Sequence, residues 1–291
     1  MPKSRTFSVL ERAEIKLLQR MYRNSISFPF LSGDAFASLA DIVIRDETDL
    51  KSLSHYPAGK KVVFCQSRLV PRIRQFILSE TKHAVLIAGN DDYDFQAKNE
   101  LPLENFQHFY LQNSFISDDV KVHTLPIGVE NLSIGINGLP KYLSSYSFVG
   151  EKVPKVLVGP FSPTNVERSE LINFASTDNQ TFEIISNYSS PKAYAKISAS
   201  FKFIACPRGN GVDTHRFWEA LYRGSIPIVK KSEWSRGLEN LGLGFIQVED
   251  WSETKLRTEM FEETSSDIAG SNAALWFSWW KERIQNFKLE S

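Results

Sequence analysis

Hydrophobic and polar positions along this chain follow two alternating patterns. Short apolar runs of about five residues, rich in Val, Ile and Phe, predict buried strands. Longer stretches with apolar residues at helical spacing separate these runs and predict helices. In the first half the apolar runs lie at 40–44, 61–65, 84–88, 106–110 and 122–125, with a helix predicted over 67–78. Strands that alternate with helices indicate an α/β domain with a largely parallel sheet.

The alternation restarts after residues 132–154, which are rich in Gly, Pro and Ser and predict a linker. Beyond them, strands are predicted at 155–158, 182–185, 201–205 and 226–229, and helices at 166–175, 191–198 and 214–223. We therefore expect two α/β domains, over residues 1–145 and 146–270, followed by a C-terminal segment over 271–291. Ligands of such sheets bind beyond the carboxyl ends of the strands, so the loops there are the first places to look for a site.

Composition narrows the class of protein. The chain has 291 residues with 34 Lys and Arg against 34 Asp and Glu, so no overall basic field attracts nucleic acid. The two cysteines, Cys65 and Cys206, lie in predicted strands, which argues against a disulfide framework and for a reducing compartment. No apolar run has the length of a membrane span, and residues 1–18 do not resemble a signal peptide. We expect a soluble, cytoplasmic protein.

The loop after the strand at 201–205 carries the clearest chemistry. Two glycines let the backbone turn sharply, and a helix begins directly afterwards, with free N–H groups that favour an anion. The planar guanidinium groups of Arg208 and Arg216 can each donate two hydrogen bonds to a phosphate. Glu219, one turn along the helix from Arg216, can accept hydrogen bonds from ribose hydroxyls. The segment predicts a binding site for a nucleoside diphosphate, formed by Arg208, Gly209, Asn210, Gly211, Thr214, His215, Arg216 and Glu219.

A plainer interpretation of this segment is a tight turn with Arg216 and Glu219 as a surface ion pair. The dinucleotide fingerprint Gly-x-Gly-x-x-Gly is absent, because position 214 is threonine. The concentration of arginine, histidine, glycine and glutamate within twelve residues favours the functional interpretation.

Three stretches of the second half together resemble the exostosin-type glycosyltransferases. They are Phe203-Ile204-Ala205-Cys206-Pro207-Arg208-Gly209, Arg216-Phe217-Trp218-Glu219-Ala220-Leu221 and Gly224-Ser225-Ile226-Pro227-Ile228-Val229. Bacterial and viral members of that group have segments similar to Gly89-Asn90-Asp91-Asp92, Gln112-Asn113, Pro126-Ile127-Gly128-Val129-Glu130-Asn131 and Thr164-Asn165 with Glu167-Arg168. The likeness runs from about residue 60 to 230 and is most specific over 203–229.

This resemblance implies a GT-B fold, in which two Rossmann-like domains with parallel sheets face a central cleft. It implies an inverting, metal-independent transfer of a sugar from a nucleotide-diphosphate sugar to a hydroxyl of a glycan acceptor, with no cofactor required and a UDP-sugar as the favoured donor. The Glu-x₇-Glu pattern of many retaining GT-B enzymes is absent, since the position eight before Glu219 is Gly211. GT-B chains often end in a helix that crosses back to the first domain, which we expect of residues 271–291.

Inverting transfer needs a group that takes the proton of the acceptor hydroxyl. Asp92 is the first candidate, because it matches the aspartate of the family's loop, and Glu130 is the second. In the donor half, Asn165 and Arg168 follow the first strand and could reach the phosphates or the sugar, or else form a helix cap and an exposed arginine. Tyr194 could stack on the base, or could be a half-buried aromatic.

Several alternatives stay open. Asp92-Tyr93-Asp94 also matches the Asp-x-Asp motif by which GT-A glycosyltransferases hold Mg²⁺ or Mn²⁺. A pyruvyl transferase on a GT-B-like fold would bind phosphoenolpyruvate, and a non-catalytic module would bind sugar or nucleotide alone. Trp276, Trp279 and Trp280 are predicted to share one face of a C-terminal helix, which would either pack on the protein or give peripheral contact with the inner membrane face.

Overall fold

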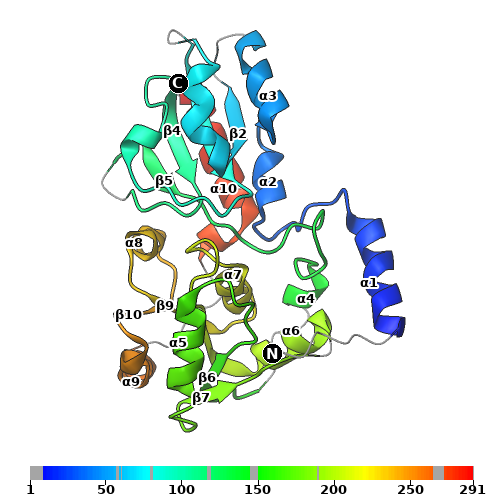
Figure 1. The fold of residues 1–291 in the computed structure, drawn as a ribbon, viewed down its shortest axis with the longest axis vertical. Coiled ribbons are helices and arrows are strands. Elements are labelled where there is room, and N and C mark those ends of the chain that lie inside the picture. The colour runs from blue at the N-terminus through cyan, green and yellow to red at the C-terminus, as the bar shows by residue number, and fades with distance from the viewer. Residues whose placement is uncertain are drawn as a thin grey trace.

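The fold of the computed structural model consists of two five-stranded parallel sheets, placed one above the other in Figure 1. The structure describes residues 9–290 except 57, 58, 60, 79, 80, 117, 118, 145–149, 189 and 265–271. The first sheet has its strands in chain order: β1 (Ile42–Ile44), β2 (Val62–Gln66), β3 (His83–Gly89), β4 (Phe106–Leu111) and β5 (Val122–Thr124). The prediction of two α/β sheets with parallel strands is therefore confirmed.

The second sheet has a different strand order, β10-β9-β8-β6-β7. Its strands are β6 (Val153–Val158), β7 (Phe182–Ile184), β8 (Phe201–Ala205), β9 (Ile226–Lys230) and β10 (Ile246–Val248). The chain runs outward from β6 to β7, then returns to the other side of β6 at β8. This reversal opens a crevice beyond the carboxyl ends of β6 and β8, the place where open α/β sheets bind ligands.

Helices cover both sheets. Their bounds are α1 (Val9–Tyr22), α2 (Gly33–Ala37), α3 (Glu47–Ser52), α4 (Lys141–Ser144), α5 (Val166–Ala175), α6 (Pro191–Ala199), α7 (His215–Tyr222), α8 (Glu233–Glu239), α9 (Thr254–Thr264) and α10 (Phe277–Glu290). Short 3₁₀ segments are η1 (Leu53–His55), η2 (Ser67–Gln75), η3 (Lys98–Glu100), η4 (Trp251–Glu253) and η5 (Ala273–Leu275).

Alternate residues of each strand face different cores, as strands covered on both faces require. In β2, Phe64 belongs to the core shared with α10, whereas Val63 and Cys65 face η2. In β8, Ile204 packs with the residues of α7, whereas Phe203 packs with those of α5. Because every residue of β3 is buried, this strand reads as a continuous apolar run in the sequence.

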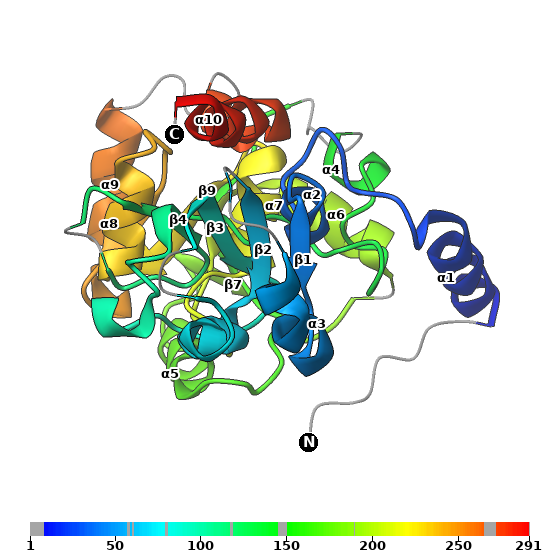
Figure 2. The ribbon, with the colours of Figure 1, turned by 90° about the horizontal axis from the view of Figure 1, so that it is seen from above.

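The C-terminal helix α10 returns from the second sheet to the first. It contacts β3, and Figure 2 shows it on the opposite face of that sheet from α3. The Trp280 ring is buried against Phe36 and Tyr110, and its Nε1 donates to the Ala274 carbonyl at 2.8 Å. Trp276 precedes the helix and packs on Phe30, so this aromatic cluster lies against protein. Within the described residues, no helix combines the length and apolarity that crossing a membrane demands.

Two local predictions differ from the structure. The helix expected over 67–78 is the 3₁₀ segment η2, which contains Pro71, a residue without the N–H that an α-helix needs. The linker expected over 132–154 is largely packed: Leu132, Ile136, Leu139, Tyr142 and Leu143 are buried, and α4 contacts α6 and α7. Its residues 145–149 lie outside the described part of the chain.

Candidate functional site

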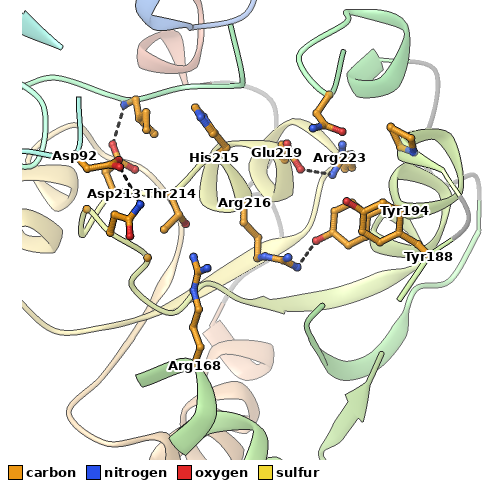
Figure 3. A pocket seen from close by; sticks show the side chains of 16 residues that line it. Asp92, Arg168, Tyr188, Tyr194, Asp213, Thr214, His215, Arg216, Glu219 and Arg223 are labelled. Atoms are coloured by element: carbon orange, nitrogen blue, oxygen red, sulfur yellow. Dashed lines mark hydrogen bonds and ion pairs between the residues drawn. The ribbon is translucent and has the colours of Figure 1, made fainter. Parts of the chain in front are cut away.

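A cavity of about 250 Å³ lies at the crevice beyond β6 and β8. The loop after β8 and the first turn of α7 form one wall, and Tyr188 and Tyr194 lie at one end, as Figure 3 shows. The residues of the predicted nucleotide site that line it are Arg168, Tyr194, Gly209, Asn210, Gly211, Thr214, His215, Arg216 and Glu219. The structure therefore brings together most of the residues that the sequence predicts for this site.

Arg216 is fixed in the wall of this cavity by neutral groups. Its guanidinium donates to the carbonyl oxygens of Gly159 and Pro160, each at 2.8 Å, and to the hydroxyl of Tyr194. The rings of Phe161 and Tyr194 lie 4.8 and 5.0 Å from its central carbon. In the described part of the chain, the carboxylates nearest this wall pair with Arg208 and Arg223, and none forms an ion pair with Arg216.

Arg168 of α5 is a second cation of the same wall. Its Nε donates to the Arg208 carbonyl at 3.0 Å and its Nη1 to the Ser162 carbonyl at 2.9 Å. Burial, and next the nearby charge of Arg216, lower the pKa of Arg168 below its usual range. Two cations that repel one another in a partly buried cavity stabilise a bound anion strongly.

The amino end of α7 adds to the positive potential of the cavity. Thr214 is the N-cap residue, yet its side chain makes no capping hydrogen bond. The helix dipole favours negative charge beside its first turn. By contrast, Asn165 is the N-cap of α5 and accepts from the N–H of Glu167 at 3.0 Å. Asn165 does not line the cavity, so its contribution here is to hold the helix that carries Arg168.

Arg208 does not line this cavity, whereas the sequence predicts that it belongs to the nucleotide site. Its Nη2 forms an ion pair with Asp94 of the first half and donates to the Asn210 carbonyl at 3.2 Å. Arg208 instead lines a separate depression, together with Glu167 and Lys230. Three arginines line the cavity, Arg168, Arg216 and Arg223, and Arg223 is paired with Glu219. Arg208 instead joins the two halves of the molecule.

Glu219 lines the cavity, and its ion-pair partner is Arg223 instead of the Arg216 of the plainer interpretation. Its Oε2 accepts from the buried Arg223 at 3.0 Å, one turn further along α7. Arg223 also donates to the hydroxyl of Ser198 at 3.1 Å, which fixes the pair. The surface pair of Arg216 and Glu219 that a plain turn would give is absent.

Tyr194 is buried rather than open for stacking, and burial raises its pKa to about 12. Its ring packs on Tyr188, with centroids 5.0 Å apart and an angle of 36° between the planes. Tyr188 also lines the cavity and is the more accessible of the two rings. Tyr188 could not be predicted from the sequence, because it lies in a loop without a recognisable motif.

A second cavity, of about 410 Å³, lies on the first half and adjoins the first. Both cavities are lined by Asp92, Ile127 and His215. Amides and carboxylates dominate the rest of its wall: Asp34, Gln66, Asn90, Gln112, Asn131 and Ser133. Phe64 supplies an aromatic surface. Such a wall suits a ligand with many hydroxyl groups.

These polar groups form a connected network. The Asn131 Nδ2 donates to the Asn90 Oδ1 at 2.8 Å, and the Ser133 hydroxyl donates to Asp34 at 2.6 Å. Asn90 has a φ of 56°, and its N–H donates to the Gln112 Oε1 at 3.0 Å. The Gln112 Nε2 is buried and has no hydrogen-bond partner among the described residues, so a donor of this network is unused there.

The two predicted catalytic carboxylates have different positions. Asp92 is exposed at the junction of the cavities, and its Oδ2 accepts from the Asn210 Nδ2 at 3.0 Å. Glu130 lines neither cavity: its Oε2 accepts from the backbone N–H and the Nδ2 of Asn137, at 3.0 and 2.9 Å. Glu130 thus anchors the loop that brings Asn137 to the first cavity.

The Asp-x-Asp sequence is divided between two partners, Asn210 for Asp92 and Arg208 for Asp94. Among the residues that the structure describes, no cluster of three or more His, Cys, Asp or Glu side chains is placed to hold a metal ion.

Asp213 is a buried acid of the cavity wall that the sequence did not single out as a site residue. Its carboxylate accepts from the Ile127 N–H at 2.8 Å and the Trp218 Nε1 at 2.9 Å. Burial raises its pKa to about 7, against the opposing effect of these hydrogen bonds. Its own N–H donates to the Asn113 Oδ1 at 2.9 Å. Gly211 permits this approach, because a Cβ there would lie 2.6 Å from Asn113.

Comparison with known proteins adds no family to this geometry. No protein-family model matches the chain, and no curated protein matches it.

Proposed function

We propose that the protein is a nucleotide-sugar-dependent glycosyltransferase. One observation carries the proposal: Arg168 and Arg216 lie at the reversal point of the second sheet beside the amino end of α7, and neither forms an ion pair with a carboxylate of the described residues. This is a site for a compact, multiply charged anion such as a diphosphate. The resemblance of residues 203–229 to exostosin-type glycosyltransferases supports the same assignment.

The remaining lining residues suit the other parts of a nucleotide sugar. Glu219 keeps a carboxylate oxygen for ribose hydroxyls beyond the one that binds Arg223, and Tyr188 offers an aromatic face to the base. A UDP-sugar is the donor that we favour. The donor sugar would then lie toward Asp92, Ile127 and His215, where the second cavity begins.

The second cavity would hold the glycan acceptor. Its amides and carboxylates can exchange hydrogen bonds with sugar hydroxyls, and Phe64 can pack against a ring face. An acceptor hydroxyl at the junction would attack the anomeric carbon from the side opposite the diphosphate, which inverts the configuration. The two arginines and the α7 amino end would stabilise the charge of the leaving diphosphate. The proposed reaction includes no metal ion or other cofactor.

The enzyme would act in the cytoplasm. Cys65 and Cys206 are both buried and do not form a disulfide with each other, which suits a reducing compartment.

Calorimetric titration with UDP, GDP, CMP, ADP and phosphoenolpyruvate in EDTA tests the donor site. We expect a nucleoside diphosphate to bind, and Arg216→Ala or Arg168→Ala to weaken it by about tenfold or more, as loss of a charged hydrogen bond does. Arg236→Ala is the matched control, because this arginine pairs with Glu233 on the surface. Binding of phosphoenolpyruvate alone would favour the pyruvyl transferase, and binding only with Mn²⁺, lost in Asp92→Asn, would favour the metal-dependent alternative.

A further inference from the structure

His215 occupies the junction of the two cavities. It is the first residue of α7 and lines both the anion cavity and the amide-rich cavity, as do Asp92 and Ile127. From the sequence, His215 is expected to belong to the binding site of a nucleoside diphosphate. Its hydrogen bonding indicates a different role.

The Nδ1 of His215 lies 2.8 Å from the carbonyl oxygen of Gly128. A carbonyl oxygen only accepts hydrogen bonds, so Nδ1 carries the hydrogen. In the neutral ring the other nitrogen, Nε2, is then left with a lone pair. A histidine whose tautomer is fixed in this way is prepared to accept a proton.

The Gly128 carbonyl is itself held firmly. Gly128 has a φ of +67°, and a Cβ at this position would lie 2.1 Å from the Leu31 carbonyl oxygen. The next residue, Val129, donates to that same oxygen at 2.7 Å. Behind His215, Phe217 and Trp218 are fully buried and hold α7. The imidazole is therefore positioned from both sides before any ligand binds.

The other two candidates are less suited to accept the proton. Asp92 is exposed and engaged with the Asn210 amide, and Glu130 lines neither cavity. The acidic groups that face His215 across the cavities are Asp34, Asp91, Asp92 and Glu219, and the cations are Arg45, Arg168, Arg216 and Arg223. Asp213, the preceding acid in the chain, is buried and turned toward Ile127 and Trp218.

We propose that His215 is the general base of the transfer reaction, an inference that rests on the proposed glycosyltransferase function. The acceptor oxygen forms a bond to the anomeric carbon as the bond from that carbon to the phosphate oxygen breaks. The electron pair of the broken bond leaves with the diphosphate. The hydroxyl proton passes to Nε2, and the imidazolium later releases it to solvent.

The decisive variant is His215→Asn. The asparagine amide can still donate to the Gly128 carbonyl, but it offers no basic nitrogen to the acceptor. We expect kcat to fall by about 10²–10⁴-fold, the usual contribution of a general base. The Kd of the nucleoside diphosphate that binds wild type should change by less than about threefold. His55→Asn is the control, since the His55 ring contacts a backbone carbonyl at an exposed position outside both cavities.

The assay measures nucleoside diphosphate released from UDP- and GDP-sugars with simple glycoside acceptors. His215→Gln is made in parallel, so that a folding defect in one variant does not decide the result. Transfer by either folded variant within about threefold of wild type would overturn the assignment. If wild type itself binds no nucleoside diphosphate, the glycosyltransferase proposal fails instead, and the base assignment fails with it. Loss of diphosphate binding together with activity in both histidine variants contradicts the base role and indicates a donor-binding role.

Discussion

The Asp213 carboxylate accepts a hydrogen bond from the backbone N–H of Ile127 at 2.8 Å, so one buried side chain of the second half holds a loop of the first. Ile127 lines both cavities. The loop from Arg208 to His215 makes further contacts of this kind, with Asp92, Asp94, Asn113 and Gly128. The segment that forms one wall of the first cavity thus also connects the two halves of the molecule.

Asp213 gives the stability of the protein a distinctive pH dependence. Its pKa is raised from 3.8 to about 7 in the folded state, so the folded protein binds this proton more tightly than the unfolded chain. The free energy of unfolding should therefore decline as pH rises from about 4 to about 7, then level off. Asp213→Asn does not titrate and should lose this component, on the order of a few kcal/mol. Urea unfolding of both proteins at several pH values measures the difference. Parallel pH profiles for the two proteins would contradict the buried, protonated Asp213.

Arg208→Ala separates the two roles considered for this arginine. Its guanidinium pairs with Asp94 and does not line the anion cavity, so we expect UDP affinity to change much less than in Arg216→Ala. The variant should instead lose a contact between the halves and lower the free energy of unfolding by about 1 kcal/mol, as a partly exposed ion pair does. Calorimetric titration and urea unfolding check the two parts. Equal losses of UDP affinity in Arg208→Ala and Arg216→Ala would indicate that Arg208 also binds the nucleotide.

The difference between these arginines marks the limit of prediction from the sequence. The Gly-rich turn and the helix after β8 could be predicted, because local composition specifies them and strand ends locate them. Which arginine faces the ligand depends on Asp94, more than one hundred residues away, and no local pattern records that pairing. The sequence alone allows Arg168 either a ligand contact or an exposed helix position. Its hydrogen bonds to the carbonyls of Arg208 and Ser162 place it in the cavity wall.

Tyr188 should contribute to the binding of the base. Its ring lines the cavity and packs on the buried Tyr194. Tyr188→Ala should weaken nucleoside diphosphate binding by about 1–3 kcal/mol if the base stacks there, whereas Tyr188→Phe keeps the ring and should bind like wild type. Titration with the nucleoside diphosphate and with inorganic pyrophosphate measures this. An equal loss for pyrophosphate, which has no base, would point to a distorted cavity instead of lost stacking.

Glu130 is expected to be structural. Its Oε2 accepts two hydrogen bonds from Asn137, and a glutamine oxygen can accept the same two. Glu130→Gln should therefore retain transfer activity, whereas Glu130→Ala should lower the free energy of unfolding by about 1–3 kcal/mol. Activity assays and urea unfolding on both variants test this. If Glu130 were the general base, Glu130→Gln would instead lower kcat by about 10²–10⁴-fold.

The loop held by Glu130 also shows why composition predicted a linker at 132–154 where the chain is largely packed. Gly135, Gly138 and Pro140 are typical of a linker, but Gly135 and Gly138 lie so close to Glu130 that a Cβ would meet it at 2.2 and 2.0 Å. Glycine here permits tight packing, whereas in a linker it gives flexibility. A flexible linker and a tightly packed loop can therefore have the same composition. The burial of Ile136 and Leu139 shows that this segment is a packed loop.

Transfer of sugar in EDTA is the most direct test of the central claim. The chain is incubated with UDP- and GDP-sugars and simple glycoside acceptors, and both the released nucleoside diphosphate and the anomeric configuration of the product are followed by NMR. We predict a glycoside of inverted configuration, formed without added metal and lost in Arg216→Ala. The absence of transfer from every donor by a folded chain, or transfer that requires Mn²⁺, would contradict this account.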